Sequence, residues 1–346
     1  MYKKLFVISL MLLLSTPGFA SDKLVFAVDI IRHGDRTPLH DITPYHQWQV
    51  APGELTATGM AEEYHLGQQM RQLYVRQTHL LPMHYQSDAL YVSSSDYNRT
   101  LMSADAFLMG LYPLGTGPKL PNSMLPALPR AYQPIPIHTE AMANDKLFFP
   151  LTDKQRKRLE QKYVFNRADW QAKQQALQPY FAAWSKTTGL NIASLDDIIT
   201  LGDTLYIRSL YHVALPSGIS PKQSQEILKD GQWALATLYG SPEMGQAYSH
   251  NLKQAIDHYL QGATHADSPL KYVLFSAHDT TILAMLSDLG VATTEHIPYA
   301  SDLNFQLWES DQHQYLVKIS FNGTTLHIPA CAGKVCTLSQ FNKIAS

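Results

Sequence analysis

The chain has 346 residues, of which 45% are hydrophobic and only 16% charged, and its formal net charge is -2. This apolar fraction is enough for a packed core, so a disordered chain is excluded, and no low-complexity or Pro/Gly-periodic tract indicates a fibrous protein. A near-neutral charge without runs of Lys or Arg argues against binding to a nucleic-acid duplex. The length fits two average domains, or one large α/β domain with an insertion. The unusual feature is histidine: there are 15, against 27 Lys and Arg together, so the chain would become strongly cationic in acid.

Residues 1–20 have the pattern of a secretory signal peptide. Lys3 and Lys4 give a positive start, an apolar run covers residues 5–14, and small residues lie around Ala20, the expected cleavage position. A membrane anchor is the alternative, but this run is too short to span a bilayer as a helix, and no later stretch approaches the required length. We therefore expect an exported protein, periplasmic or secreted, with no membrane span after cleavage.

The first part of the mature chain alternates strands and helices. The near-continuous apolar run at residues 24–31 is typical of a buried parallel strand. Apolar residues at helical spacing predict an amphipathic helix over residues 56–76. A second strand is expected at residues 89–93, and a helix at residues 100–111.

The pattern changes after a proline-rich loop over residues 121–136, which includes a short strand near residues 135–137. From about residue 145 to residue 266, no strong strand pattern interrupts the helical ones. Helices are expected at residues 152–162, 168–187, 205–214, 221–239 and 242–261. This stretch indicates an α-rich insertion between two parts of one sheet domain.

Strand–loop–helix order returns toward the C-terminus. A strand at residues 272–276 precedes a helix at residues 280–289, and a hairpin follows over residues 304–309 and 315–321. Asn322-Gly323 is a tight-turn pair before another short strand. These elements predict an α/β protein with an open, mainly parallel sheet, helices on both faces, and a smaller α-helical domain inserted in the chain.

Three polar clusters follow predicted parallel strands, at the sheet edge where open α/β proteins bind ligands. The candidate site residues in these clusters are Arg32, His33, Arg36, Arg99, His278 and Asp279. Planar guanidinium groups match phosphate oxygens in charge and geometry. Three guanidiniums, two imidazoles and one carboxyl group suit transfer of a phosphoryl group through a phosphohistidine.

The charges suggest how such a site would work. A nucleophilic imidazole must be neutral, and the arginines beside His33 should depress its pKa and keep it neutral in mild acid. The same arginines would stabilise the charge on the phosphoryl oxygens during transfer. Bound phosphate would favour the cationic form of His278. The carboxyl group of Asp279 would protonate the leaving alkoxide and then activate water.

Each residue also has a simpler interpretation. His33 alone would be a structural histidine, Arg99 a member of a surface ion pair, and His278-Asp279 a turn or a helix N-cap. An Arg-His-Gly-x-Arg-x-Pro sequence rarely arises by chance, so the joint occurrence of the clusters favours a site. None of the usual metal-binding motifs is present, and we expect neither a metal ion nor a cofactor.

Two cysteines, Cys331 and Cys336, lie near the C-terminus. In an exported protein we expect them to form a local disulfide bond. A metal site is the alternative, but it would need further ligands nearby, and none are evident in the sequence.

Taken together, the motifs resemble the histidine acid phosphatase family, which is branch 2 of the histidine phosphatase superfamily. Residues 32–38 are similar to its RHGxRxP signature, and residues 55–60 to the LTxxG segment that follows. Residues 94–104 resemble its second arginine loop, and residues 276–281 its catalytic HD motif. The order and separations of the motifs also match. The resemblance therefore covers essentially the whole mature chain and is weakest in the helical insertion.

This resemblance implies a role for each candidate residue. His33 would be the nucleophile and Asp279 the proton donor. The phosphate-binding residues would be Arg32, Arg36, Arg99 and His278. The fold would be an α/β core over residues 21–139 and 268–346, with an α-helical cap over residues 140–267 that shapes the leaving-group pocket.

The subgroup of the family that the chain resembles indicates which substrates to expect. Thr281 stands where bacterial phytases and glucose-1-phosphatases of the family commonly have Asn, and the cysteine pair resembles that of prostatic and lysosomal members. The resemblance therefore implies a secreted bacterial acid phosphatase that uses small phosphomonoesters broadly, from a subgroup whose members are often homodimers. The alternatives are a hydrolase selective for phytate, sugar phosphates or nucleotides, and a phosphate-ligand binding protein without turnover.

Overall fold

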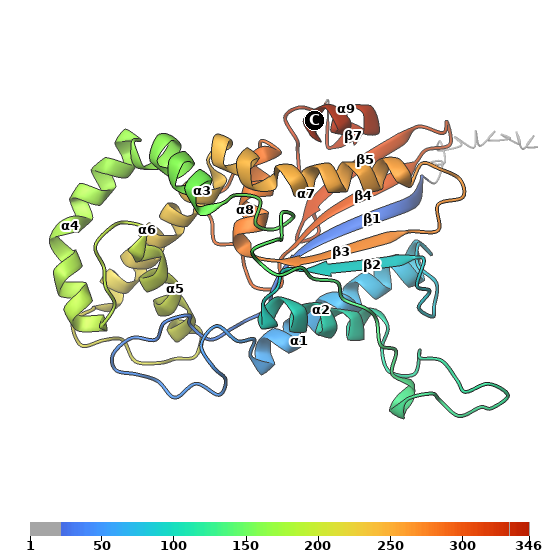
Figure 1. The fold of residues 1–346 in the computed structure, drawn as a ribbon, viewed down its shortest axis with the longest axis horizontal. Coiled ribbons are helices and arrows are strands. Elements are labelled where there is room, and N and C mark those ends of the chain that lie inside the picture. The colour runs from blue at the N-terminus through green and yellow to red at the C-terminus, as the bar shows by residue number, and fades with distance from the viewer. Residues whose placement is uncertain (1–21, 332, 346) are drawn as a thin grey trace, which may run out of the picture.

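The computed structural model describes residues 22–331 and 333–345 (Figure 1). The signal peptide predicted at residues 1–20 lies outside the described residues. The centre of the molecule is one sheet with the spatial order β2-β3-β1-β4-β5-β6, in which β7 also pairs with β5. The strands are β1 (Lys23–Arg32), β2 (Leu90–Ser94), β3 (Tyr272–Ala277), β4 (Asp302–Glu309), β5 (Tyr315–Phe321), β6 (Thr324–Thr325) and β7 (Val335–Thr337).

The sheet joins a parallel part to an antiparallel part. Strand β3 pairs in parallel with both β1 and β2, whereas β4 pairs antiparallel with β1, and β5 antiparallel with β4. Strands β1 and β3 are buried over nearly their whole length, which explains their continuous apolar sequences. The expected α/β class with an open sheet is confirmed, and the predicted hairpin supplies the antiparallel strands beside β1.

Helices cover both faces of the sheet (Figure 1). One face carries α1 (Ala57–Met70) and α2 (Asn98–Leu111), and the other carries α7 (Pro242–Gly262), α8 (Asp279–Asp288) and α9 (Leu338–Ala345). Alternate residues of β1 serve the two cores: Ala27 and Ile31 pack on the first face, Val28 and Ile30 on the second. A π-helical segment, Arg71–Gln77, continues α1 and extends it over the predicted length.

Four helices of the insertion form a lobe beside the sheet (Figure 1). This inserted lobe consists of α3 (Asp153–Glu160), α4 (Ala168–Thr188), α5 (Asp197–Leu210) and α6 (Pro221–Gly240). Its own apolar cluster includes Trp170, Trp184 and Leu205. Helix α7 packs elsewhere, because Leu252 and Ile256 share a core with the sheet. A cap over residues 140–267 remains our proposal, and within it α7 lies on the sheet.

Two sequence-based predictions of elements were wrong. The helix expected at residues 205–214 runs instead from Asp197 to Leu210. This helix includes Gly202, where a Cβ would lie 3.3 Å from the carbonyl oxygen of Ile227, so the glycine serves close packing of α5 on α6. The strand expected near residues 135–137 is absent, and an isolated bridge joins Ser93 to His138. Prolines in that segment have no N–H to donate to a ladder.

The C-terminal segment contains β7 and α9, which the sequence patterns did not predict. The expected disulfide bond between Cys331 and Cys336 is present, and both residues lie in the core cluster that contains Phe341 of α9. None of the helices in the described part of the chain is both long and apolar enough to cross a membrane.

Candidate active site

Parallel pairing brings the three predicted clusters together. Arg32 lies opposite Ala277 in the β1–β3 ladder, and Ser94 lies opposite Ser276 in the β2–β3 ladder. The chain therefore leaves β1, β2 and β3 at the same edge of the sheet, where parallel strands end. The ring centroids of His33 and His278 are only 5.5 Å apart as a result. All six predicted site residues are brought to this edge.

The hydrogen bond of His33 defines its tautomer. Its Nδ1 lies 2.9 Å from the carbonyl oxygen of Gly34. Because a carbonyl oxygen only accepts, Nδ1 carries the proton and Nε2 has the free lone pair. The residue is only 2% exposed. Burial, together with the charge of Arg32, lowers the pKa of His33 well below its ordinary value, so the imidazole is neutral in mild acid.

Two glycines fix the loop that carries His33. A Cβ on Gly34 would clash with the carbonyl oxygen of Gly59, and one on Gly59 would clash with that of Asp35. The loop therefore rests directly on the first turn of α1. Gly34 N donates to Ser103 Oγ of α2 at 3.1 Å, which ties the loop to the second helix as well.

Arg32 is fully buried and held on several sides. Its Nη2 lies 2.8 Å from Asp279 Oδ2, and its Nη1 donates to the carbonyl oxygen of Ile297. Nη1 also lies 3.3 Å from His296 Nε2, and the guanidinium carbon is 4.2 Å from the ring centre of Tyr299. Burial and the charge of Arg32 lower the pKa of His296 to about 4, so its ring is neutral and can accept this hydrogen bond.

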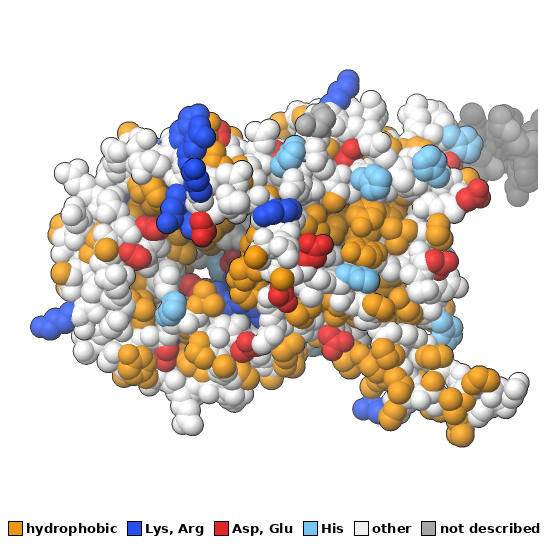
Figure 2. Space-filling view, viewed as in Figure 1, with side chains coloured by type: hydrophobic (Ala, Val, Ile, Leu, Met, Phe, Trp, Pro, Cys, Tyr) orange, Lys and Arg blue, Asp and Glu red, His pale blue; other side chains and the backbone are white. Residues whose placement is uncertain are grey.

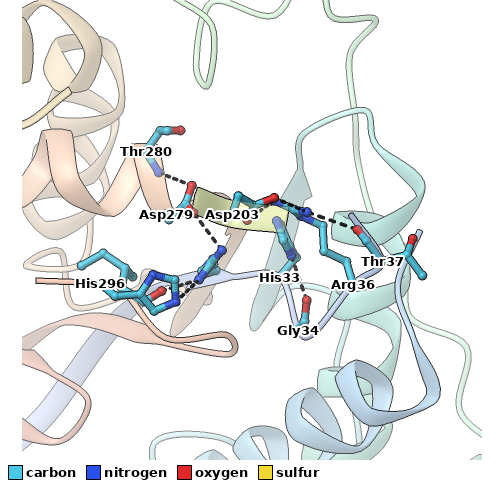
Figure 3. Close-up of polar contacts among 10 residues, drawn as sticks. His33, Gly34, Arg36, Thr37, Asp203, Asp279, Thr280 and His296 are labelled. Carbon is cyan, nitrogen blue, oxygen red and sulfur yellow. Dashed lines mark hydrogen bonds and ion pairs between the residues drawn. The ribbon is translucent and has the colours of Figure 1, made fainter. Parts of the chain in front are cut away.

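The other two arginines reach the site from different elements. Arg36 forms a bidentate ion pair with Asp203 of α5, with Nη1–Oδ2 and Nη2–Oδ1 distances of 3.0 and 3.1 Å (Figure 3). Arg99 lies in the first turn of α2, and its guanidinium carbon is 4.2 Å from the ring centre of Tyr97. Its buried Nε has no hydrogen-bond partner among the described residues.

His278 and Asp279 begin helix α8. His278 Nε2 lies 2.9 Å from Ser95 Oγ, and Asp279 Oδ1 accepts from the backbone N–H of Thr280 at 2.8 Å. Burial and the charge of Arg99 lower the pKa of His278 to about 3, so the protein groups alone favour its neutral form. The cationic form expected from the sequence therefore requires bound phosphate. Burial raises the pKa of Asp279, but Arg32 and Arg36 outweigh it and hold this pKa below its ordinary value.

These groups face a cavity of about 260 Å³ between the sheet edge and the inserted lobe. Figure 2 shows the molecule hollowed between the lobe and the rest of the chain. His33, Arg36, Arg99, His278 and Asp279 lie at its polar end. The apolar walls come from Leu39, Phe149, Ile199, Leu228 and Leu235.

Several residues of the site had no role in the sequence-based interpretation. Ser95 follows a predicted strand inside a recognised motif, so its position was a usable signal. Asp203, His296 and Tyr299 lie on a helix of the insertion and on the loop before β4, outside every motif. Only the folded chain brings them to the arginines.

The arrangement is suited to a tetrahedral oxyanion. It combines a neutral imidazole with a free Nε2 lone pair, three guanidiniums, and a carboxyl group 2.8 Å from one of them. No group of three or more His, Cys, Asp and Glu side chains that could hold a metal ion occurs within residues 22–331 and 333–345.

Comparison with known proteins identifies the family. A family model described as the histidine phosphatase superfamily (branch 2) matches residues 23–322. The chain belongs to this superfamily. Human lysosomal acid phosphatase is 30% identical over 344 residues, which cover 95% of this chain and 78% of the relative. Bovine prostatic acid phosphatase is 29% identical over 359 residues, covering 98% and 90% of the two chains. The membership inferred from the motifs is confirmed.

Solved structures of phytases share the fold. The phytase from Citrobacter braakii has a TM-score of 0.68 and 17% identity, with 94% of this chain and 97% of the phytase covered. The apo form of Hafnia alvei phytase has a TM-score of 0.67 and 19% identity, with 96% and 97% covered. At this level of identity the likeness shows the histidine phosphatase fold and nothing about the substrate.

Proposed function

We propose that this protein is an exported acid phosphatase that hydrolyses phosphomonoesters broadly, through a phosphohistidine on His33. The observation that carries the proposal is the His33 tautomer: Nδ1 is bonded to the Gly34 carbonyl, so Nε2 keeps its lone pair beside Arg32 and Arg36. The similarity to lysosomal and prostatic acid phosphatases supports the same activity.

In the first step, His33 Nε2 attacks phosphorus. The Nε2–P bond forms while the bond from phosphorus to the ester oxygen breaks, and Asp279 gives its proton to the leaving alkoxide. The guanidiniums of Arg32, Arg36 and Arg99 stabilise the charge on the phosphoryl oxygens. The products are an alcohol and a phosphohistidine.

In the second step, water replaces the alcohol. The Asp279 carboxylate accepts a proton from water as its oxygen attacks phosphorus, and the Nε2–P bond breaks. Inorganic phosphate leaves, His33 regains its lone pair, and Asp279 regains its proton. The cycle closes without an additional reactant.

The ion pair between Arg32 and Asp279 links substrate binding to proton transfer. With a 2.8 Å contact to Arg32, Asp279 is held as a carboxylate, which cannot donate a proton. A phosphate dianion on Arg32 adds negative charge beside Asp279 and raises its pKa. Substrate binding in mild acid therefore supplies the protonated carboxyl group that the leaving group needs.

The cavity supports broad specificity over a phytate-selective site. A site selective for a polyphosphate needs several cations around the leaving group, whereas the lining of this cavity contains no lysine, and its arginines are Arg36 and Arg99, which belong to the phosphate subsite. The remaining walls are mostly apolar. Relative rates on phytate, nucleotides, sugar phosphates and phosphotyrosine would test this, because a steep preference for one of them would contradict broad use.

Two features support the proposed export: the signal-peptide pattern of residues 1–20 and the Cys331–Cys336 disulfide bond, since disulfide bonds persist in oxidising compartments. Periplasm and extracellular space both meet this condition. Fractionation of cells that express the full chain would locate the mature protein, and an uncleaved cytosolic protein would contradict the proposal.

The decisive experiment is trapping the phosphoenzyme. The wild-type protein is mixed with a labelled phosphomonoester and quenched, and the label is expected on His33 as an acid-labile, alkali-stable adduct. His33→Ala should fold, trap no label and show no turnover, whereas His265→Ala, which changes an exposed histidine, should behave as wild type. Turnover by folded His33→Ala, or label elsewhere, would contradict the mechanism. Phosphate binding without any turnover by the wild type would favour the binding-protein alternative.

A further inference from the structure

The inserted lobe contributes one carboxylate to the phosphate site. Asp203 of α5 pairs with both terminal nitrogens of Arg36 at 3.0 and 3.1 Å. The Arg36 side chain is almost completely buried, whereas that of Asp203 is 21% exposed and borders the cavity. On α5, Ile199, Gly202, Asp203 and Tyr206 follow helical spacing and line the same cavity wall. Asp203 therefore faces the substrate space.

Phosphate and Asp203 compete for the same guanidinium. The two hydrogen bonds that Asp203 accepts come from the two Arg36 nitrogens that would hold phosphoryl oxygens in a bidentate manner. When phosphate takes one of them, the carboxylate gives up part of its pairing. Because α5 lies across the cavity from the strand ends, the released charge then faces the leaving group.

The rest of the cavity does not offset that charge. Arg36 and Arg99 lie in the phosphate subsite, and the side chains farther along the cavity, among them Leu228, Gln232 and Leu235, include no Lys or Arg. A second phosphate on the leaving group would meet the Asp203 carboxylate in a poorly solvated space without a second cation. An ammonium group at the same place would be attracted to it.

We propose that Asp203 is a specificity-determining residue that disfavours phosphomonoesters whose leaving group carries further negative charge and favours those whose leaving group is neutral or carries an amino group. This inference rests on the proposed phosphatase function. It specifies the substrate class more narrowly, because it orders substrates by the charge of the alcohol.

Three substrates share one phosphate and a propyl chain and differ in the group at the far end of the chain: aminopropyl phosphate, hydroxypropyl phosphate and propanediol bisphosphate. For the wild type we expect kcat/KM to fall in that order. In Asp203→Asn, the ratio of the aminopropyl to the bisphosphate kcat/KM should fall about tenfold, which corresponds to about 1.4 kcal/mol. Asp203→Glu keeps the charge and should keep most of the ratio. The ratio is formed within each variant, so a general loss of activity cancels.

Asp196→Asn is the matched control, because it removes an exposed aspartate at the start of the same helix, outside the cavity. It should leave the ratio at the wild-type value. An unchanged ratio in Asp203→Asn, or an equal change in Asp196→Asn, would overturn the inference. If Asp203→Asn does not fold, Asp203→Ser, which also removes the charge, takes its place, and an unchanged ratio in this variant would overturn the inference. A wild type without turnover of any of the three substrates would instead refute the phosphatase function itself.

Discussion

At the scale of single residues, the state of each titratable group follows from its neighbours. Arg32 holds Asp279 as a carboxylate, and burial and the charge of Arg99 keep His278 neutral. Burial and the same cations keep the His33 imidazole neutral. The site is therefore suited to a phosphate dianion. Its negative charge would favour the protonated forms of Asp279 and His278, whereas the arginines would still favour the neutral form of His33.

Asp279→Asn should affect poorly activated leaving groups most. An alkoxide needs a proton in the transition state, whereas nitrophenolate hardly does, so kcat/KM for an alkyl phosphate should fall about a hundredfold or more and that for nitrophenyl phosphate much less. Steady-state kinetics on the two substrates would measure this. Equal losses would mean that Asp279 acts by holding Arg32 and not as a proton donor.

The decrease of kcat/KM on the acid side of the pH profile should not reflect protonation of a histidine. Because the pKa of His33 is lowered well below 6.5, its imidazole stays neutral as the pH falls through that value. With nitrophenyl phosphate, kcat/KM should therefore not decrease between about pH 7 and about pH 5. A loss of activity with an apparent pKa near the ordinary histidine value of about 6.5 would contradict the proposed state of His33.

At the scale of elements, the approach of α1 to α2 holds the His33 loop in place. A Cβ on Gly67 of α1 would clash with the carbonyl oxygen of Phe107, and one on Gly110 of α2 would clash with that of Tyr64. The two helices therefore cross with backbone against backbone. Both also contact the loop, because Gly59 belongs to α1 and Ser103 to α2.

Gly67→Ala should lower the free energy of unfolding by about 1–3 kcal/mol, because backbone atoms cannot move aside as a side chain can. Urea denaturation would measure this, with residual activity as a second readout of loop position. Gly262→Ala is the matched control: a Cβ at this helical glycine of α7 meets nothing within 4 Å. It should be neutral or stabilising by up to about 1 kcal/mol. If both variants lost the same stability, close helix packing would not be the cause.

At the scale of the whole molecule, two sets of buried groups respond to pH in opposite directions. The lowered pKa values of His33, His278 and His296 mean that the unfolded chain binds more protons than the folded one in mild acid, so these groups reduce stability as the pH falls. Asp29 has the opposite effect. It is fully buried in β1, Tyr272 donates to it at 2.6 Å, and burial raises its pKa to about 6.

Comparison with Asp29→Asn measures the titration of Asp29 together with that of Asp302, because burial and the charge of Asp29 raise the pKa of Asp302. The folded state keeps the proton of Asp29 up to about pH 6, whereas the unfolded chain loses it near the ordinary aspartate pKa of 3.8. Relative to the variant, the wild type should therefore lose on the order of 2–3 kcal/mol as the pH rises from about 4 to about 7. Urea denaturation across this range would measure the difference, in which the histidine contributions cancel. A pH-independent difference would show that Asp29 titrates normally.

Much of this protein could be predicted from the sequence, because its strongest signals are local. The apolar runs of β1 and β3 indicate buried strands, and parallel strands that end in polar motifs must present them at one sheet edge. His33, Asp279 and the three arginines were identified for that reason. Local patterns failed where packing decides: the helix expected at residues 205–214 begins at Asp197 instead, and it contains Gly202, which allows close packing on α6.

The order of the residues along the chain establishes which chemical groups the protein possesses and at which sheet edge they lie. The partners and protonation states of these groups follow from folding. Arg36 and Asp203 are 167 residues apart, and Arg32 and His296 are 264 apart, so no local pattern could pair them. The His33 tautomer, the neutral His278 and the position of Asp203 across the cavity depend on burial and on charges from distant segments. Those quantities exist only once the chain has folded.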